Sequence, residues 1–416
     1  MVDKIVENEK EGKSESMIKK AAVFLCALCL LLVCSFSTAE SISVPVFDNM
    51  KVFEVPDNEA LRFVRELKTG WNLGNTFDAF DVRNWYRGDE LGMESAWVKT
   101  ITTREDIHAL KEAGFNLIRI PCTWKEHVDE NDVISAVWLN RVKEVASWVL
   151  EEGMYAIVNV HHDDRYVENF YLDKAHYDRT AAYMSSIWRQ LAEAFADTDE
   201  HLILESMNEP RLFGTQWEWS WDSKNVQCQE AMECINQLNQ LFVDTVRAAG
   251  GHNATRYLAV PSYCANPWNA VSDQFVLPTD SVENHIIVAA HAYTPYNFAL
   301  NLNSTDRTFS LDDGPKKAEI AGFLKALYEK YVQHGIPVLM DEYGALNKGG
   351  NLQDRVNFTA YYVASASARG ITCCWWDNHN FTGDGEQFGI LDRKYAAFTY
   401  PEIVEAIMKN CLIGRE

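Results

Sequence analysis

The segment Leu202-Ile-Leu-Glu-Ser-Met-Asn-Glu-Pro-Arg211 decides the fold class of this chain. It opens with a short apolar run, which is typical of a strand buried on both faces of a parallel sheet. Polar residues follow, and Pro210 ends the strand because proline lacks a backbone N–H. Val338-Leu-Met-Asp-Glu-Tyr-Gly344 has the same plan, with Gly344 as the breaking residue. Two such segments predict a sheet whose strands end in polar, loop-forming residues.

Eight apolar runs of this kind occur along the chain, and amphipathic segments separate most of them. The predicted strands are residues 70–73, 116–120, 155–160, 202–205, 257–260, 286–291, 337–342 and 371–376. Apolar residues at helical spacing predict helices over residues 107–113, 137–152, 177–195, 227–249, 318–334 and 356–369. Four of these helices precede a glycine that suits the residue just past a helix end: Gly114, Gly153, Gly250 and Gly335. The alternation predicts an α/β fold, a single (β/α)₈ TIM barrel, with a poor helix at 262–279.

The N-terminal residues predict export. Residues 21–36 are apolar and uncharged, Lys19 and Lys20 precede them, and the small residues 37–39 follow. This is a signal-peptide pattern, so we expect residues 1–40 to be a signal peptide, with Met17 as a possible true start. An uncleaved anchor is the alternative. We expect a lead-in at 41–58, a catalytic barrel at 59–416 and a secreted or extracytoplasmic protein without stable membrane association.

Charge and cysteine content narrow the class of partner. The net charge is −22 and the pI about 4.9, which disfavours nucleic acid because phosphates need a basic surface. Seven cysteines follow residue 40, so at least one is free, and Cys228 and Cys234 are close enough in sequence for a disulfide. The absence of repeated CxxC pairs disfavours structural zinc. We expect no metal, no cofactor and a monomer that acts on a neutral substrate.

Polar and aromatic residues fall where the predicted strands end. In a barrel of this type, functional residues lie at the carboxyl ends of the strands. The residues at these positions are Asn72, Asn75, Arg119, His161, Asn208, Glu209, His291, Tyr293, Glu342 and Trp376. We therefore expect them to meet at one end of the barrel.

Glu209 and Glu342 predict glycoside cleavage. One carboxyl must protonate the leaving oxygen while the other, ionised, attacks the anomeric carbon or activates water. We expect the pKa of Glu209 to be raised and Glu342 to stay ionised, with Arg119 and Tyr293 stabilising its charge. The run from His161 to Asp164 offers a different hypothesis, a metal-dependent hydrolase, but neighbouring strand residues point to opposite faces and rarely bind one ion.

Seven motifs together resemble a known family. They are Gly70-Trp-Asn-Leu-Gly-Asn-Thr76, Gly114-Phe-Asn-Leu-Ile-Arg-Ile-Pro121, Asn159-Val-His-His162, Met207-Asn-Glu-Pro-Arg211, His291-Ala-Tyr293, Asp341-Glu-Tyr-Gly344 and Trp375-Trp-Asp-Asn378. The chain is similar to glycoside hydrolase family 5 of clan A, and within it to endo-β-1,4-glucanases (cellulases). The resemblance runs from about residue 61 to residue 412.

The resemblance implies a retaining double displacement on cellulose-type and mixed-linkage β-glucans. It implies that Glu209 is the acid/base and Glu342 the nucleophile, and that Arg119 and Tyr293 hold Glu342 ionised. It further implies that Asn208 contacts the sugar 2-hydroxyl, that His161 and His291 are cleft histidines, and that Trp376 lies under the cleaved sugar. The same machinery also serves xyloglucanases, xylanases and mannanases, and a carbohydrate-binding pseudoenzyme is the alternative outside catalysis.

The residues expected to line the substrate site lie on the loops at the same end of the predicted barrel. They are Trp71, Asn75, Trp124, His162, Trp217, Trp268, Tyr296 and Asn378. The dense aromatic run Trp217-Glu-Trp-Ser-Trp221 either stacks on distal sugars or packs on itself, and the sequence leaves both readings open.

Overall fold

Eight parallel strands close into one barrel in the computed structural model, which describes residues 41–81 and 88–414. The contacts divide the chain into Met1–Ser43 and Val44–Glu416, and every element below lies in the second unit. The strands follow chain order around the barrel: β1 (Gly70–Leu73), β2 (Leu117–Ile120), β3 (Tyr155–Asn159), β4 (Leu202–Glu205), β5 (Leu258–Pro261), β6 (Ile286–His291), β7 (Val338–Tyr343) and β8 (Thr372–Asp377). The predicted (β/α)₈ barrel is confirmed.

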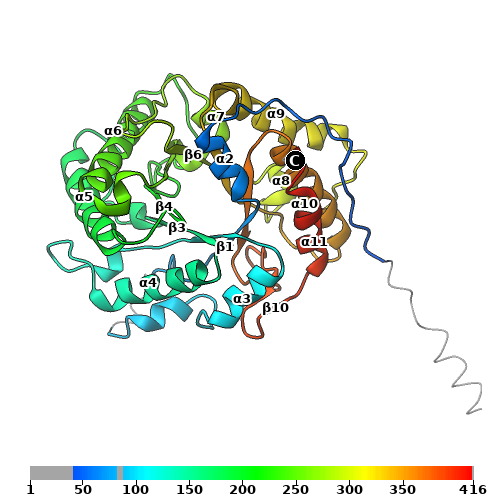
Figure 1. Ribbon diagram of the computed structural model, residues 1–416, viewed down its shortest axis with the longest axis horizontal. Coiled ribbons are helices and arrows are strands. Elements are labelled where there is room, and N and C mark those ends of the chain that lie inside the picture. The colour runs from blue at the N-terminus through cyan, green and yellow to red at the C-terminus, as the bar shows by residue number, and fades with distance from the viewer. Residues whose placement is uncertain (1–40, 82–87, 415–416) are drawn as a thin grey trace, which may run out of the picture. The chain divides into compact units, whose positions relative to one another are not determined.

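Helices surround the strands, as Figure 1 shows. Those that match predicted helices are α3 (Arg104–Glu112), α4 (Ala136–Glu151), α5 (Tyr177–Ala194), α6 (Val226–Ala248), α9 (Gly314–Lys330) and α10 (Leu352–Ser367). The glycines predicted to follow four of these helices all have positive φ. The poor pattern in the fifth unit corresponds to a helix of one turn, α7 (Pro267–Ala270). Besides α2 and six short 3₁₀ helices, the described residues also form α8 (Tyr296–Ala299), α11 (Pro401–Asn410), β9 (Leu391–Asp392) and β10 (Ala397–Phe398).

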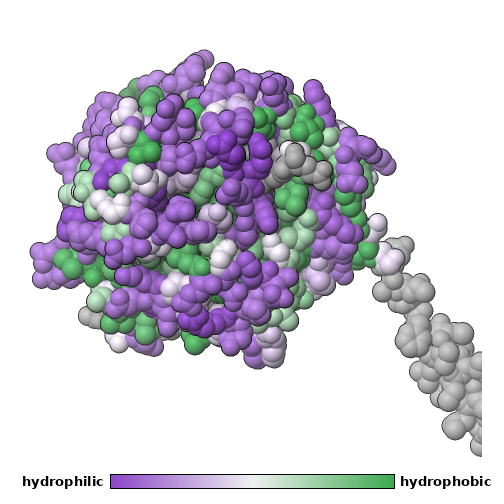
Figure 2. Space-filling view, viewed as in Figure 1, coloured by the Kyte–Doolittle hydropathy of each residue, from purple (hydrophilic) through white to green (hydrophobic). Residues whose placement is uncertain are grey.

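A helix that the sequence analysis missed, α2 (Glu59–Glu66), closes the amino-terminal end of the barrel. Its residues Ala60, Phe63 and Val64, with Leu67, form one core cluster with side chains from seven of the barrel strands, β2 to β8. Asn58 caps the helix by accepting a hydrogen bond from Leu61 N at 2.8 Å. Figure 2, which shows this end of the unit, carries mainly hydrophilic residues. The carboxyl ends of the strands, where the candidate residues were expected, lie at the opposite end of the barrel.

Strand β7 contains a bulge that changes which side chains point inward. Met340 pairs with Cys373 and Tyr343 with Trp375, so two residues of β7 oppose one residue of β8. The same extra residue appears against β6. A bulge re-aims the side chains around it. Tyr343 consequently faces outward and stacks on Tyr362 of α10 at 4.6 Å between ring centroids, whereas Asp341 and Glu342 both face the barrel interior.

Two expectations fail or fall outside the described residues. The prediction of a disulfide between Cys228 and Cys234 is wrong, because both cysteines are free. Both lie in α6, where a difference of six positions places them about 9 Å apart along the helix axis, too far for a disulfide. The predicted signal peptide lies outside the described residues. Within 41–81 and 88–414, no helix is long and apolar enough to cross a bilayer.

Candidate active site

The two glutamates meet at the carboxyl end of the barrel. Glu209 lies in the loop after β4 and Glu342 is near the end of β7. One oxygen of each carboxylate and one nitrogen of His291 all lie within 4.8 Å of one another. The Glu209 side chain is 18% exposed and that of Glu342 only 6%. One carboxyl is thus open to a ligand while the other lies deeper in the same site.

Arg119 of β2 uses every N–H of its guanidinium inside the barrel. Nε and Nη2 donate to the two oxygens of Glu205, each at 2.7 Å. Nη1 donates to Glu342 Oε1 at 2.6 Å and to Asn72 Oδ1 at 3.0 Å, and Nη2 also donates to Asn208 Oδ1 at 2.8 Å. Five donors are all that a guanidinium has. Because Asn208 accepts through its oxygen, its amide nitrogen remains for a ligand.

Glu342 receives a second hydrogen bond, from Tyr293. The phenol donates to Oε2 at 2.9 Å, so each carboxylate oxygen has one donor. Burial nevertheless raises the pKa of Glu342, against the lowering effects of His291 and Arg119. The fixed donors orient the carboxylate, and burial strips it of water. Both conditions favour a nucleophile.

His291, at the end of β6, bridges the two glutamates. Its Nδ1 lies 2.8 Å from Glu209 Oε1 and 3.7 Å from Glu342 Oε2. Although burial alone would raise the pKa of Glu209, the hydrogen bond and charge of His291 lower it. This direction and that of Glu342 are the reverse of the sequence expectation, which did not include the histidine. The same contact couples the protonation of His291 to that of Glu209.

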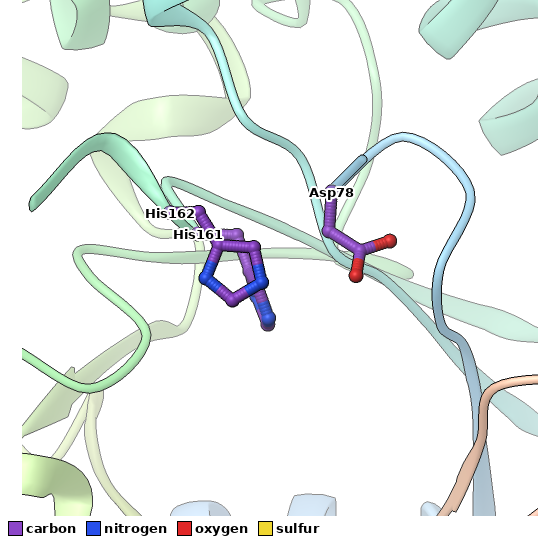
Figure 3. A group of neighbouring side chains, drawn as sticks. All are labelled: Asp78, His161 and His162. Carbon is purple, nitrogen blue, oxygen red and sulfur yellow. The ribbon is translucent and has the colours of Figure 1, made fainter. Parts of the chain in front are cut away.

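His161 and His162 form a second group with Asp78, shown in Figure 3. The imidazole rings lie 4.5 Å apart, although we expected them to face opposite ways, because both residues follow the end of β3 and leave strand geometry. Burial lowers the pKa of both, so the rings are neutral at neutral pH. The two oxygens of Asp78 accept hydrogen bonds from the backbone N–H groups of Asn75 and Thr76, so this carboxylate stabilises the loop after β1.

The four residues His161 to Asp164 do not converge on one point. Asp163 accepts hydrogen bonds from Trp124 N and from the Tyr183 hydroxyl. Asp164 forms an ion pair with Arg211 at 2.6 Å. The two aspartates are thus committed to separate partners away from the histidine pair. The geometry does not support the metal site that the sequence offered as an alternative.

Trp376, the last tryptophan of β8, forms an apolar surface beside the glutamates. It clusters with Leu346 and Phe388, and Tyr293 packs against the same group. Gly74 permits this position, since a Cβ there would lie 2.9 Å from the indole ring. The His161 ring lies parallel to the indole at 5.8 Å between centroids. An aromatic face next to two carboxyls suits a ligand with an apolar ring face.

Three residues predicted to bind substrate are buried in the protein instead. Trp71 and Trp124 have no exposed surface, and their indole N–H groups donate to Asp377 and to Asn159 O. Asn378 is 4% exposed and its amide donates to Glu386 O. Trp71 and Trp124 thus pack in the barrel wall rather than at an open surface, and Asn378 holds the loop after β8.

The other predicted substrate residues spread over several loops. Trp217 is partly exposed in the loop after β4. Tyr296, the first residue of α8, is 59% exposed. Asn75 and His162 are also partly exposed. Trp268 is 57% exposed on α7, but its ring approaches Gly322 of α9, on the outer layer of helices. Trp268 is therefore not brought to the site.

Three site residues were not singled out by the sequence. Glu205 and Asp341 are fully buried around Arg119, and Arg211 is 2% exposed. Arg211 donates to Glu209 O at 2.9 Å, so it fixes the backbone that carries this glutamate. Charged residues inside apolar strand ends were the signal, since a carboxylate is rarely buried without a partner. A small cavity adjoins Glu209; its lining includes His161, Asn208 and Met207.

Comparison with known proteins points in one direction. A family model described as cellulase (glycosyl hydrolase family 5) matches residues 82–382. Endoglucanase A of Ruminococcus albus is 38% identical over 86% of this chain and 94% of its own length. The cellulase/esterase CelE of Acetivibrio thermocellus is 36% identical over 94% of this chain, which spans only 47% of that longer protein. A lichenase of glycoside hydrolase family 5 from a Caldicellulosiruptor species, a mutant solved with cellotetraose, shares 47% identity and a TM-score of 0.87, covering 89% of this chain and 99% of that one.

Proposed function

Since the chain belongs to glycosyl hydrolase family 5, we propose that it is a retaining endo-β-1,4-glucanase that cleaves internal bonds of cellulose-type and mixed-linkage β-glucans. The observation that carries the retaining mechanism is the distance between the carboxyls. Oxygens of Glu209 and Glu342 lie within 4.8 Å of each other. Retaining glycosidases hold their carboxyls about 5–5.5 Å apart, whereas inverting ones leave room for a water between them.

In the first step, Glu342 attacks the anomeric carbon. The bond to the glycosidic oxygen breaks while Glu209 gives its proton to that oxygen, which leaves with the departing chain. The sugar is now an ester of Glu342. The hydrogen bonds from Arg119 and Tyr293 support this step because they aim both oxygens of the nucleophile.

In the second step, Glu209 acts as a base. Its carboxylate takes a proton from water, the water oxygen attacks the anomeric carbon, and the ester bond to Glu342 breaks. The enzyme returns to its starting protonation state with the sugar configuration retained. His291 supports this exchange of roles, since its Nδ1 lies within hydrogen-bond distance of Glu209.

Sugar recognition involves the remaining residues of the site. The free amide nitrogen of Asn208 suits a hydroxyl next to the anomeric carbon, and the neutral ring of His161 suits another. Trp376 offers its face to the sugar that is cleaved. Trp217 and Tyr296 are the exposed aromatics that we assign to more distant sugars. The N-terminal segment exports the protein.

A substrate panel tests the proposed activity. Residues 41–416 are assayed for reducing-sugar release from carboxymethyl cellulose, mixed-linkage glucan, xyloglucan, xylan and mannan, beside Glu342→Ala and the exposed-surface control Glu319→Ala. We expect release from the glucans that only Glu342→Ala abolishes. Release confined to xyloglucan, xylan or mannan would reassign the substrate. Release that survives Glu342→Ala would remove this residue as the nucleophile.

Proton NMR of the first product tests the stereochemistry. A retaining enzyme releases a β-configured reducing end, which then equilibrates to the α form. Initial appearance of the α form would contradict the double displacement. The same spectra, recorded on cello-oligosaccharides of increasing length, report which internal bond is cut first.

A further inference from the structure

Asp341 is a buried carboxylate for which the two-glutamate mechanism gives no role. It is 0% exposed, and neither of its oxygens accepts a hydrogen bond from residues 41–81 or 88–414. A carboxylate buried without hydrogen bonds is costly, so it needs a nearby cation. An apolar residue would fill the same space at lower cost. The charge at this position therefore calls for a function.

The β7 bulge aims Asp341 at the centre of the barrel. In a regular strand, neighbours point to opposite faces, so an inward Glu342 would place Asp341 outside. The extra residue lets both side chains turn inward. Asn72 holds this backbone, since its amide nitrogen donates to Asp341 O at 2.8 Å. The position of the carboxylate is thus fixed by the fold.

The basic side chain closest to Asp341 is that of His291. His291 Nε2 lies 3.4 Å from Asp341 Oδ1, and Arg119 Nε lies 3.7 Å from the other oxygen. Arg119 already gives that N–H to Glu205 at 2.7 Å. On the other side of the imidazole, Nδ1 lies 2.8 Å from Glu209 Oε1. Asp341, His291 and Glu209 therefore form a continuous chain from the barrel interior to the open carboxyl.

We propose that Asp341 is a positioning residue for the acid/base: it keeps a proton on Nε2 of His291, so that Nδ1 shares the catalytic proton with Glu209. This inference rests on the proposed function and deepens it. A carboxylate at one imidazole nitrogen selects the tautomer in which that nitrogen is protonated. The other nitrogen then accepts a proton from Glu209 or returns it.

The shared proton accounts for both roles of Glu209. With the proton on Glu209 and a neutral His291, Glu209 is an acid that can protonate the leaving oxygen. With the proton on Nδ1, Glu209 is a carboxylate that can take a proton from water. No proton is gained or lost in the exchange, because it moves along the 2.8 Å contact. Asp341 stabilises the cationic imidazole of the second form.

The charges around His291 set the sign of the expected effect. The groups that face it are Glu209 from the loop after β4, Glu205 from β4, Asp341 and Glu342 from β7, Arg119 from β2, Tyr293 from its own loop and His161 after β3. Burial alone would lower the pKa of His291, but Glu342 and Asp341 raise it well above its ordinary value. Removing the charge of Asp341 makes the pair of Glu209 and His291 release its proton at lower pH.

The pH profile of Asp341→Asn tests the proposal. We measure kcat/KM for cellotetraose hydrolysis, whose poor leaving group requires the acid. We expect the alkaline limb to move to lower pH by about one unit, as for loss of a charge next to a titrating group. The matched control is Asp280→Asn, which neutralises a 4% exposed carboxylate paired with Arg247 far from the site and should leave both limbs in place. If Asp341→Asn does not fold, the same pH profile is measured on Asp341→Ser, which also removes the negative charge.

A second measurement does not depend on activity. In ¹⁵N-histidine-labelled protein, the imidazole signals of His291, identified by their loss in His291→Gln, report its tautomer and titration. We expect Nε2 to stay protonated in wild type, and the midpoint to fall in Asp341→Asn. An unmoved alkaline limb in a folded variant, or an unmoved midpoint, would overturn the proposal. If wild type hydrolyses no glucan, the proposed function fails, and the imidazole titration still decides whether Asp341 controls His291.

Discussion

Replacing Tyr293 with phenylalanine removes one hydrogen bond from Glu342, the proposed nucleophile, and nothing else of comparable size. The phenol donates to Glu342 Oε2 at 2.9 Å, while Arg119 holds Oε1 at 2.6 Å, so the carboxylate keeps its anchor in the variant. A hydrogen bond to a charged group contributes about 1.5–3 kcal/mol. One pKa unit corresponds to about 1.4 kcal/mol, so the loss equals roughly one to two units.

The direction follows from which form of Glu342 the phenol stabilises. The donor favours the ionised carboxylate, so its removal raises a pKa that burial has already raised. The acidic limb of kcat/KM, which reports the free enzyme, should therefore move to higher pH by one unit or more. On that limb the rate falls about tenfold per unit. Above the limb, where Glu342 is ionised in both proteins, the difference should largely disappear.

Tyr362→Phe is the matched control for this experiment. Its buried phenol donates to a neutral group, Ala292 O, at 3.0 Å. Its loss should cost about 1 kcal/mol of stability and leave the pH profile unchanged. Both variants are compared by kcat/KM on a soluble glucan across the pH range and by thermal unfolding. An acidic limb of Tyr293→Phe that stays in place, or moves to lower pH, refutes the role of the phenol in keeping Glu342 ionised.

Three further predictions concern stability and accessibility. Burial raises the pKa of Asp163 from 3.8 to about 7, so its protonated form stabilises the fold at low pH and this contribution is lost as the pH rises through 7. The difference in Tm between wild type and Asp163→Asn should therefore shrink between pH 3.8 and pH 7. A Tm difference that stays constant over this range would contradict the assignment. Gly74→Ala places a Cβ 2.9 Å from the Trp376 ring and should cost about 1–3 kcal/mol together with activity, whereas Gly314→Ala meets nothing and should be neutral in both assays. Six of the seven described cysteines are buried, so a thiol reagent should label at most Cys264 in the native protein and all seven after denaturation; protected thiols in denaturant would indicate a disulfide.

The barrel could be predicted because its strands are buried on both faces. Such strands appear as uninterrupted apolar runs, and three of the eight predicted ranges, including 202–205, coincide with the observed strands. The α2 helix was missed because its eight residues are largely polar. Its apolar residues Phe63 and Val64 pack against the end of the barrel, a surface that exists only in the folded protein. The proposed disulfide failed for a similar reason, since sequence proximity ignores the rise of a helix.

The sequence predicted which residues lie near one another in the candidate site better than it predicted their contacts and orientations. Strand-end positions brought Arg119, His291 and both glutamates to one place, as the barrel requires. The local alternation of side chains was not foreseeable at the bulge, so Asp341 was overlooked. Tryptophans in the strands serve both cores and sugars, and only the structure separates Trp71, whose N–H donates to Asp377, from Trp376, which packs with Leu346 and Phe388.

Arg119 of β2 ties together residues from three other strands, β1, β4 and β7, and from the loop after β4, which constrains how this sequence can change over evolutionary time. Its five donors are divided among Glu205, Glu342, Asn72 and Asn208. Loss of any one acceptor leaves a buried N–H without a partner, and loss of the arginine leaves several buried carboxylates without their cation at once. Substitutions at these positions are therefore strongly non-additive. A lineage can replace this network only through near-simultaneous changes, so drift should be confined to the loops that surround it.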